Sequence, residues 1–218
     1  MTTKRGPTMR VGIISDPMLF QRDGRVQEQV RSLVAALLAI GDAGGAGLRI
    51  EAADPNRTRL DAYDVIHVFS ALNGNHGVLE AAREMDVPLV LSPLLLPGWN
   101  RAISGRAPVM QRLGERRSAW NAQAAYAHTK RALQLARLVI ALDEAERATI
   151  MSAFLIETNR IRVFPQRGGA APLSPQHAAA QVIACYSGLV HGAPGAVRLR
   201  LWRKPAERRD ITGSNVTI

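Results

Sequence analysis

The sequence has almost no cysteine, and it contains no apolar run long enough to cross a bilayer. Cys185 is the only cysteine among 218 residues, so neither an internal disulfide nor a cysteine-rich metal centre can form. A membrane-spanning helix needs about 20 consecutive apolar residues, and every apolar run here is well short of that. Residues 1–10 also lack the apolar core of a signal peptide. We therefore expect a cytoplasmic protein without a metal site.

Acidic residues are nearly absent from one internal segment, which concentrates the net charge of +10. Residues 1–100 carry 10 basic and 11 acidic groups, whereas residues 101–137 carry 8 basic groups against Glu115 alone. Residues 166–218 add 7 basic and 2 acidic groups. No RNA-binding aromatic motif, zinc-ligand spacing or recognition-helix pattern accompanies this charge, so we expect no nucleic-acid partner. A basic α/β protein that binds nucleic acid is the alternative, and steep salt dependence of DNA binding would support it.

Short apolar runs alternate with helical patterns along the first three quarters of the chain. We predict buried strands at four runs and a weaker strand at a fifth: Val11–Ser15, Val65–Phe69, Leu89–Ser92 and Leu138–Leu142, with Leu48–Ala52 the weak one. After the last run, Asp143 and Glu146 have the spacing of a capping box at a helix start. This alternation predicts an α/β, Rossmann-like fold, a mostly parallel sheet with helices on both faces.

Three stretches of the sequence carry a resemblance to a known family. They are VGIISDPMLFQRDGRVQEQVRSLVAALLAIG, then DAYDVIHVFSALNGNHGVLEAAREMDVPLVLSP, then LARLVIALDEAERATI followed by NRIRVFP. Their order and spacing are similar to those of the first domain of GT-B glycosyltransferases of the group 1, family 4 type. The resemblance covers residues 9–165 and implies one half of a GT-B fold. It implies sugar transfer from a nucleotide-sugar co-substrate to an acceptor, with no cofactor and no metal. Another doubly wound domain is the alternative.

The resemblance also places candidate binding residues at the carboxyl edge of the sheet, where open α/β folds bind ligands. No catalytic residue is assigned. The candidates for a cleft or substrate site are Gly24, His67, Asn73, Asn75, His76 and Ser92.

Each candidate has a purely structural alternative. Gly24 follows Asp23 where the family has paired glycines near donor phosphate, or it merely begins a helix. His67 matches a family histidine, or it is a packed histidine bonded to backbone. The asparagines and His76 contact the acceptor, or the asparagines cap a helix. Ser92 stands near the place where many members have a cleft histidine, and that departure puts the ordinary chemistry in doubt.

The basic segment is a candidate docking face. It includes Trp99, Trp120 and Tyr126, and basic groups beside aromatics suit a membrane surface or an anionic acceptor. Peripheral membrane contact is therefore a candidate interaction, and a solvated helix face is the alternative. The residues of this basic docking face are Arg112, Arg116, Arg117, Lys130 and Arg131.

The ends of the chain lie outside the resemblance. We expect residues 1–8 to be flexible and residues 166–218 to be a poorly structured tail. The family continues from Val-Phe-Pro into Asn-Gly, whereas Pro165 is followed here by Gln-Arg-Gly. A one-base insertion at Pro165 would produce this change, and we hypothesise that the tail is its out-of-frame product. In the resembling family a second domain binds the nucleotide-sugar donor, and a chain without that domain would be inactive alone. The alternative is an acceptor- or membrane-docking subunit of a two-chain glycosyltransferase.

Overall fold

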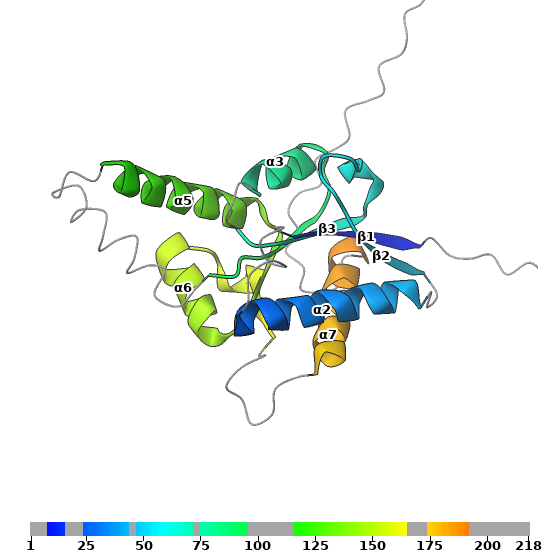
Figure 1. Ribbon diagram of the computed structural model, residues 1–218. Helices are drawn as coiled ribbons and strands as arrows, with labels where there is room; N and C mark the ends of the chain where they lie inside the picture. Colours follow the sequence, from blue (N-terminus) through cyan, green and yellow to red (C-terminus); the bar gives the residue numbers. More distant parts are fainter. Residues whose placement is uncertain are drawn as a thin grey trace, which may run out of the picture.

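Six short strands lie side by side in the computed structural model as one parallel sheet (Figure 1). The structure describes residues 8–15, 24–43, 47–71, 75–95, 116–164 and 174–191, with the side chains at 25 and 116–123 left out. The strand order is β2-β1-β3-β4-β5-β6, which confirms the predicted α/β, Rossmann-like fold. The strands are β1 Met9–Ser15, β2 Leu48–Ala52, β3 Val65–Phe69, β4 Leu89–Ser92, β5 Leu138–Ala141 and β6 Ile161–Val163.

Helices cover both faces of this sheet. They are α2 Arg25–Asp42, α3 His76–Glu84, α5 Arg116–Leu135, α6 Glu144–Phe154 and α7 Pro175–His191, with short turns η1 Leu60–Ala62 and η2 Thr158–Arg160. One apolar cluster joins the sheet to α3, α5 and α6, and a second joins the opposite face to α2 and α7. Figure 1 shows α2 and α7 together below the sheet, with α3 and α5 above it.

The winding of the chain explains which helix covers which strands. From β1 the chain turns outward through α2 to β2, then returns past β1 to β3 and continues to β6. Parallel crossovers are right-handed, so reversing the direction of travel reverses the face that the connection covers. Among the described parts of these crossovers, only α2 lies on its face of the sheet. Within the described residues, the same face of β3, β4 and β5, with Phe69, Val90 and Ile140, therefore needs another element to cover it.

Helix α7 is that element, and it corrects the prediction of a poorly structured tail. Ala178, Ala179, Val182 and Tyr186 of α7 are at most 1% exposed and pack against the sheet and α2. These positions form one face of a helix. Residues 165–173 and 192–218 lie outside the described residues, as do residues 1–7 of the expected flexible N-terminus.

The out-of-frame hypothesis loses support from the same helix. The hypothesis rested on the change of sequence after Pro165, but the tail contains α7, whose buried positions form one helix face and pack on the apolar side of the sheet. A segment read in an unselected frame has no reason to supply small side chains at positions 178 and 179 and an aromatic ring at 186. Helix α7 is therefore part of the hydrophobic core.

Candidate functional site

The carboxyl edge between β1 and β3 is the topological switch point of the sheet. From β1 the chain enters α2 on one face, and from neighbouring β3 it enters α3 on the other. The two helices diverge, and ligands of doubly wound folds bind in the crevice that opens there. Gly24 precedes α2 and Asn75 precedes α3, so both reach this edge. The structure thus brings these two predicted residues to the edge that the fold favours for a ligand.

Gly24 has an ordinary local role among the described residues. Its backbone is extended, and its carbonyl accepts a hydrogen bond from Glu28 N at 2.9 Å, which begins α2. An added Cβ would meet the carboxamide of Gln27, which is the end of a flexible side chain. The residue is exposed and lies at the N-terminal end of the α2 helix dipole. Neither the turn nor the contact requires glycine.

Asn75 shapes the edge instead of capping α3. Its side chain makes no capping bond, and Nδ2 donates to Ser70 O at 3.0 Å and to Phe69 O at 3.4 Å. These bonds hold the end of β3, where Ser70 has a left-handed φ of 83°. A non-glycine residue in that region costs about 1–3 kcal/mol, and such residues cluster at functional sites. Asn73, the other predicted asparagine, lies outside the described residues.

His76 is the first residue of α3, and its ring stacks on His128 of α5. The ring centroids are 4.1 Å apart and the planes differ by 16°. His76 Nδ1 is buried and has no hydrogen-bond partner within the described part of the chain. Native proteins rarely leave a buried nitrogen unpaired, so His76 is a candidate for a ligand contact. His128 is exposed, and the sequence pattern gave no sign of its contact with His76.

His67 and Ser92 lie inside the molecule rather than in a cleft, which corrects both assignments. They are 0% and 2% exposed. His67 Nδ1 lies 2.6 Å from the Tyr186 hydroxyl of α7, and Nε2 lies 2.9 Å from Ser92 Oγ. The ring also stacks on Phe69 at 4.1 Å. His67 is the packed histidine of the structural alternative, but its partners are side chains and not backbone groups.

Tyr186, His67 and Ser92 are hydrogen-bonded in the order of a catalytic triad, but they lack the acid–base properties that a triad needs. Burial lowers the pKa of His67 to about 3, so the imidazole is neutral and takes no proton from Ser92 near neutral pH. Burial raises the pKa of Tyr186 well above its usual value, so this group supplies no charge to stabilise an imidazolium. The network therefore fixes α7 to β3 and β4, and it places no reactive group at the surface.

Glu146 is a buried carboxylate at the carboxyl edge whose contacts the sequence foresaw only in part. Its backbone N–H donates to Asp143 Oδ1 at 2.7 Å, as a capping box requires. Its side chain does not return to Asp143. Oε1 accepts from Leu95 N and Oε2 accepts from Leu142 N, both at 2.7 Å. Desolvation by burial raises the pKa of Glu146 to about 7, helped by the charge of Asp143, against the opposing effect of the backbone N–H donors.

The predicted basic docking face is described in part. The side chain of Arg131 binds Glu80 of α3, Nε to Oε1 at 2.9 Å, and Lys130 is half-buried on α5. Arg116 and Arg117 begin α5, with their side chains not described, and Arg112 lies outside the described residues. The structure therefore describes the side chains of Lys130 and Arg131 alone among the five residues of this face, and Arg131 is already paired.

Comparisons with known proteins assign no family to this chain. No protein-family model matches the sequence, and no curated protein is significantly similar to it. In the part of the chain that the structure describes, no helix is long and apolar enough to span a membrane. The same residues hold no group of three or more histidine, cysteine or acidic side chains placed to bind a metal ion. The fold defines a doubly wound α/β protein, and function has to be argued from the switch point.

Proposed function

We propose that this chain is the acceptor-side domain of a glycosyltransferase that uses a nucleotide-sugar. The support is the way the three resembling stretches fold. The first forms β1 and α2, the second forms β3, α3 and β4, and the third forms β5, α6 and β6. The single observation that carries the proposal is the switch point between β1 and β3, where Gly24 leads into α2 and His76 begins α3.

The donor would bind elsewhere in the assembled enzyme. Sugar transfer requires stabilisation of the leaving diphosphate, and in the resembling family a second domain supplies it. The described residues contain one sheet, so the donor domain belongs to another chain or to sequence outside these 218 residues. We therefore expect no transfer by this chain alone. Appreciable transfer of radiolabelled sugar by the purified 218-residue protein would contradict this division.

Acceptor binding can be tested by NMR without turnover. The ¹⁵N-labelled chain is titrated with free sugars, alkyl glycosides and inositol phosphates, and in parallel with UDP-glucose and GDP-mannose. We expect one acceptor class to shift the backbone amides of Gly24, Asn75 and His76, and the nucleotide-sugars to leave them unchanged. His76→Ala should abolish the shift, whereas His177→Ala, an exposed histidine on α7, should retain it. A panel that leaves all three amides unmoved would argue against the acceptor site.

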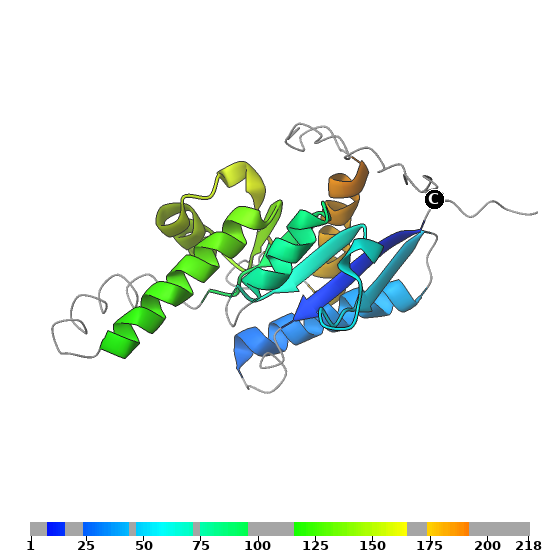
Figure 2. The same ribbon diagram turned by 90° about the horizontal axis from the view of Figure 1, so that it is seen from above.

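A docking subunit of a two-chain glycosyltransferase is the second candidate. The observation that favours it is α5, whose N-terminal half extends well beyond the sheet (Figure 2). In this version the enzyme is cytoplasmic, and the basic helix contacts the membrane surface. Flotation with phosphatidylglycerol vesicles should then exceed flotation with neutral phosphatidylcholine vesicles and weaken with salt. Equal flotation with both would remove this candidate.

A further inference from the structure

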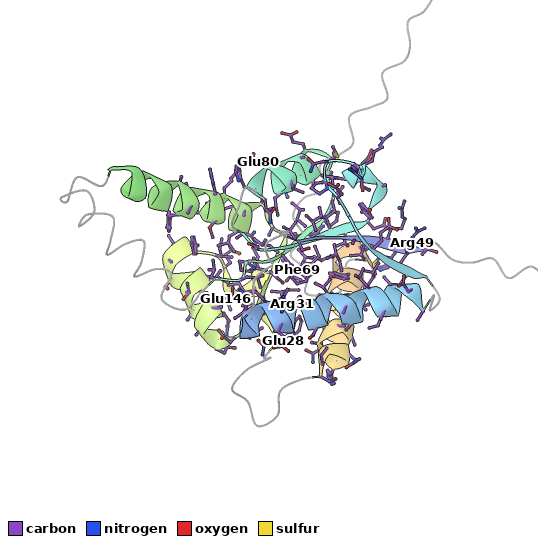
Figure 3. The ribbon with its side chains drawn as sticks, viewed as in Figure 1. Glu28, Arg31, Arg49, Phe69, Glu80 and Glu146 are labelled. Carbon is purple, nitrogen blue, oxygen red and sulfur yellow. The ribbon has the colours of Figure 1, made fainter. Side chains whose placement is uncertain are left out.

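Glu146 joins two segments that are distant in sequence. It lies in the first turn of α6, where Figure 3 labels it, and it is 6% exposed. One carboxylate oxygen accepts from Leu95 N, beyond the end of β4, and the other accepts from Leu142 N, at the end of β5. Both donors belong to the carboxyl edge of the sheet. A single side chain therefore sets the position of the segment that leaves β4 relative to the turn that enters α6.

The segment leaving β4 is held in an unfavourable backbone conformation. Leu94 has a left-handed φ of 58°, which is unfavourable for a leucine. Leu95 is 7% exposed and packs in the α3-side core, while Leu94 packs against the α2-side core. The chain thus splits two adjacent leucines between opposite faces of the sheet. The bond from Leu95 N to Glu146 is one of the polar contacts that support this conformation.

The charge of Glu146 has no cation beside it among the described residues. The segments that it bonds, 92–95 and 138–142, contain no titratable side chain. On its own helix, Asp143 acts on it with a like charge, while Glu144 and Arg147 pair with each other at 2.9 Å. The backbone N–H groups of Leu142, Leu95 and Leu94 are therefore the main favourable partners of the ionised form. A carboxylate so placed is costly to keep charged and gives up its charge readily when a proton is available.

We propose that Glu146 is a proton-operated latch that fixes the segment after β4 when ionised and releases Leu95 when protonated. A neutral carboxyl group carries a proton on one oxygen and so offers one good acceptor in place of two. Leu142 N is four residues away within the turn that Asp143 caps, so it keeps the remaining oxygen. Leu95 N then loses its acceptor, and the left-handed conformation at Leu94 loses its support. The latch goes beyond the proposed function, because it lies at the ends of β4 and β5, on the same sheet edge as the switch point of β1 and β3 that is assigned to the acceptor.

Amide hydrogen exchange measures the latch directly. The exchange of Leu95 and Leu142 is followed by NMR between pH 5 and pH 8 and corrected for the intrinsic pH dependence of exchange. We expect the protection of Leu95 to fall by roughly tenfold towards pH 5, the scale of one lost hydrogen bond, while Leu142 changes far less. Glu146→Gln, which carries one acceptor oxygen at any pH, should show the weakly protected Leu95 throughout. Glu144→Gln, in the same turn but exposed, should behave as the wild type.

Three outcomes would overturn the latch. They are a corrected Leu95 protection that does not depend on pH in the wild type, a Glu146→Gln variant that still shows the dependence, and an equal loss at Leu142. The wild-type titration alone decides the matter if the glutamine variant does not fold. The measurement uses no ligand, so its failure would leave the acceptor titration untouched, and failure of the acceptor titration would leave the latch standing.

Discussion

Removing one hydroxyl from α7 should destabilise the whole domain. Tyr186→Phe keeps the ring, which is fully buried, and deletes the oxygen 2.6 Å from His67 Nδ1. The imidazole nitrogen then has no partner in a site that water does not reach. A buried polar group left unsatisfied costs about 1–3 kcal/mol, which is a large part of the roughly 5–15 kcal/mol of an ordinary domain.

Urea denaturation followed by circular dichroism gives the free energy of unfolding. We expect Tyr186→Phe to lower it by about 1–3 kcal/mol and to lower the midpoint of thermal unfolding by about 2–4 °C for each kcal/mol. Tyr186→Ala adds a cavity, and loss of a buried aromatic ring costs about 3–5 kcal/mol.

Two matched variants isolate the cause. His177→Ala lies on the exposed side of α7 and should change the free energy of unfolding by less than about 0.5 kcal/mol. Tyr126→Phe removes a hydroxyl that donates to Ala153 O at 2.7 Å from a half-buried ring, where water can replace the bond, so its effect should be smaller. A Tyr186→Ala protein as stable as the His177→Ala protein would refute the packing of α7 and restore the view of this region as an unstructured tail.

The remaining predictions concern linkage and backbone. The pKa of His67 is lowered to about 3, so its contribution to stability is complete above about pH 6.5 and is lost as pH falls towards 3. The pKa of Glu146 is raised to about 7, so its contribution is complete below about pH 4.5 and is lost as pH rises through 7. Between about pH 4.5 and 6.5 the two groups change the free energy of unfolding in opposite directions. In that range the free energy of unfolding should fall with rising pH in His67→Gln and rise with pH in Glu146→Gln. A pH profile of the unfolding free energy that is unchanged in both variants would contradict the assignment. Gly41→Ala should destabilise, because its Cβ would lie 2.7 Å from the backbone nitrogen of Ile50, and a thermal scan that shows no loss would refute this contact. Leu155→Gly should stabilise by about 0.5–1 kcal/mol by relieving the left-handed C-cap of α6, where φ is 57° and the side chain is exposed, and a lower urea midpoint would count against it.

The strands β1, β3, β4 and β5 could be predicted from sequence because each is a largely apolar run buried on both faces. Val65–Phe69 is buried at every position, and such a run has few alternatives to a central parallel strand. The same logic missed α7. Its seventeen residues contain no acidic residue, lysine or arginine, and their apolar positions lie within a tail rich in glycine, alanine and proline. The spacing of Ala178, Val182 and Tyr186 was the available signal.

Site residues were harder to predict because their partners are far apart in the sequence. His67 bonds residues 25 and 119 positions away, and no local pattern encodes which face of β3 receives a helix. Once the strand order and the crossover faces are known, a further element must cover the α2-side face of β3. His67 is then expected to be an interior residue. Glu146 was recognisable as a capping residue, but its bond to Leu95 depends on the adjacency of β4 and β5, which appears only in the folded sheet.

The late position of α7 also has a consequence for how the chain acquires its structure. The contact between His67 and Tyr186 spans 119 residues, so the α2-side face of the sheet stays open until almost the whole domain has left the ribosome. During that interval Phe69, Val90 and Ile140 face water. Long-range contacts form late because the chain must first lose the entropy of closing the intervening loop. The nascent chain is therefore most prone to aggregate and to recruit chaperones just before α7 docks.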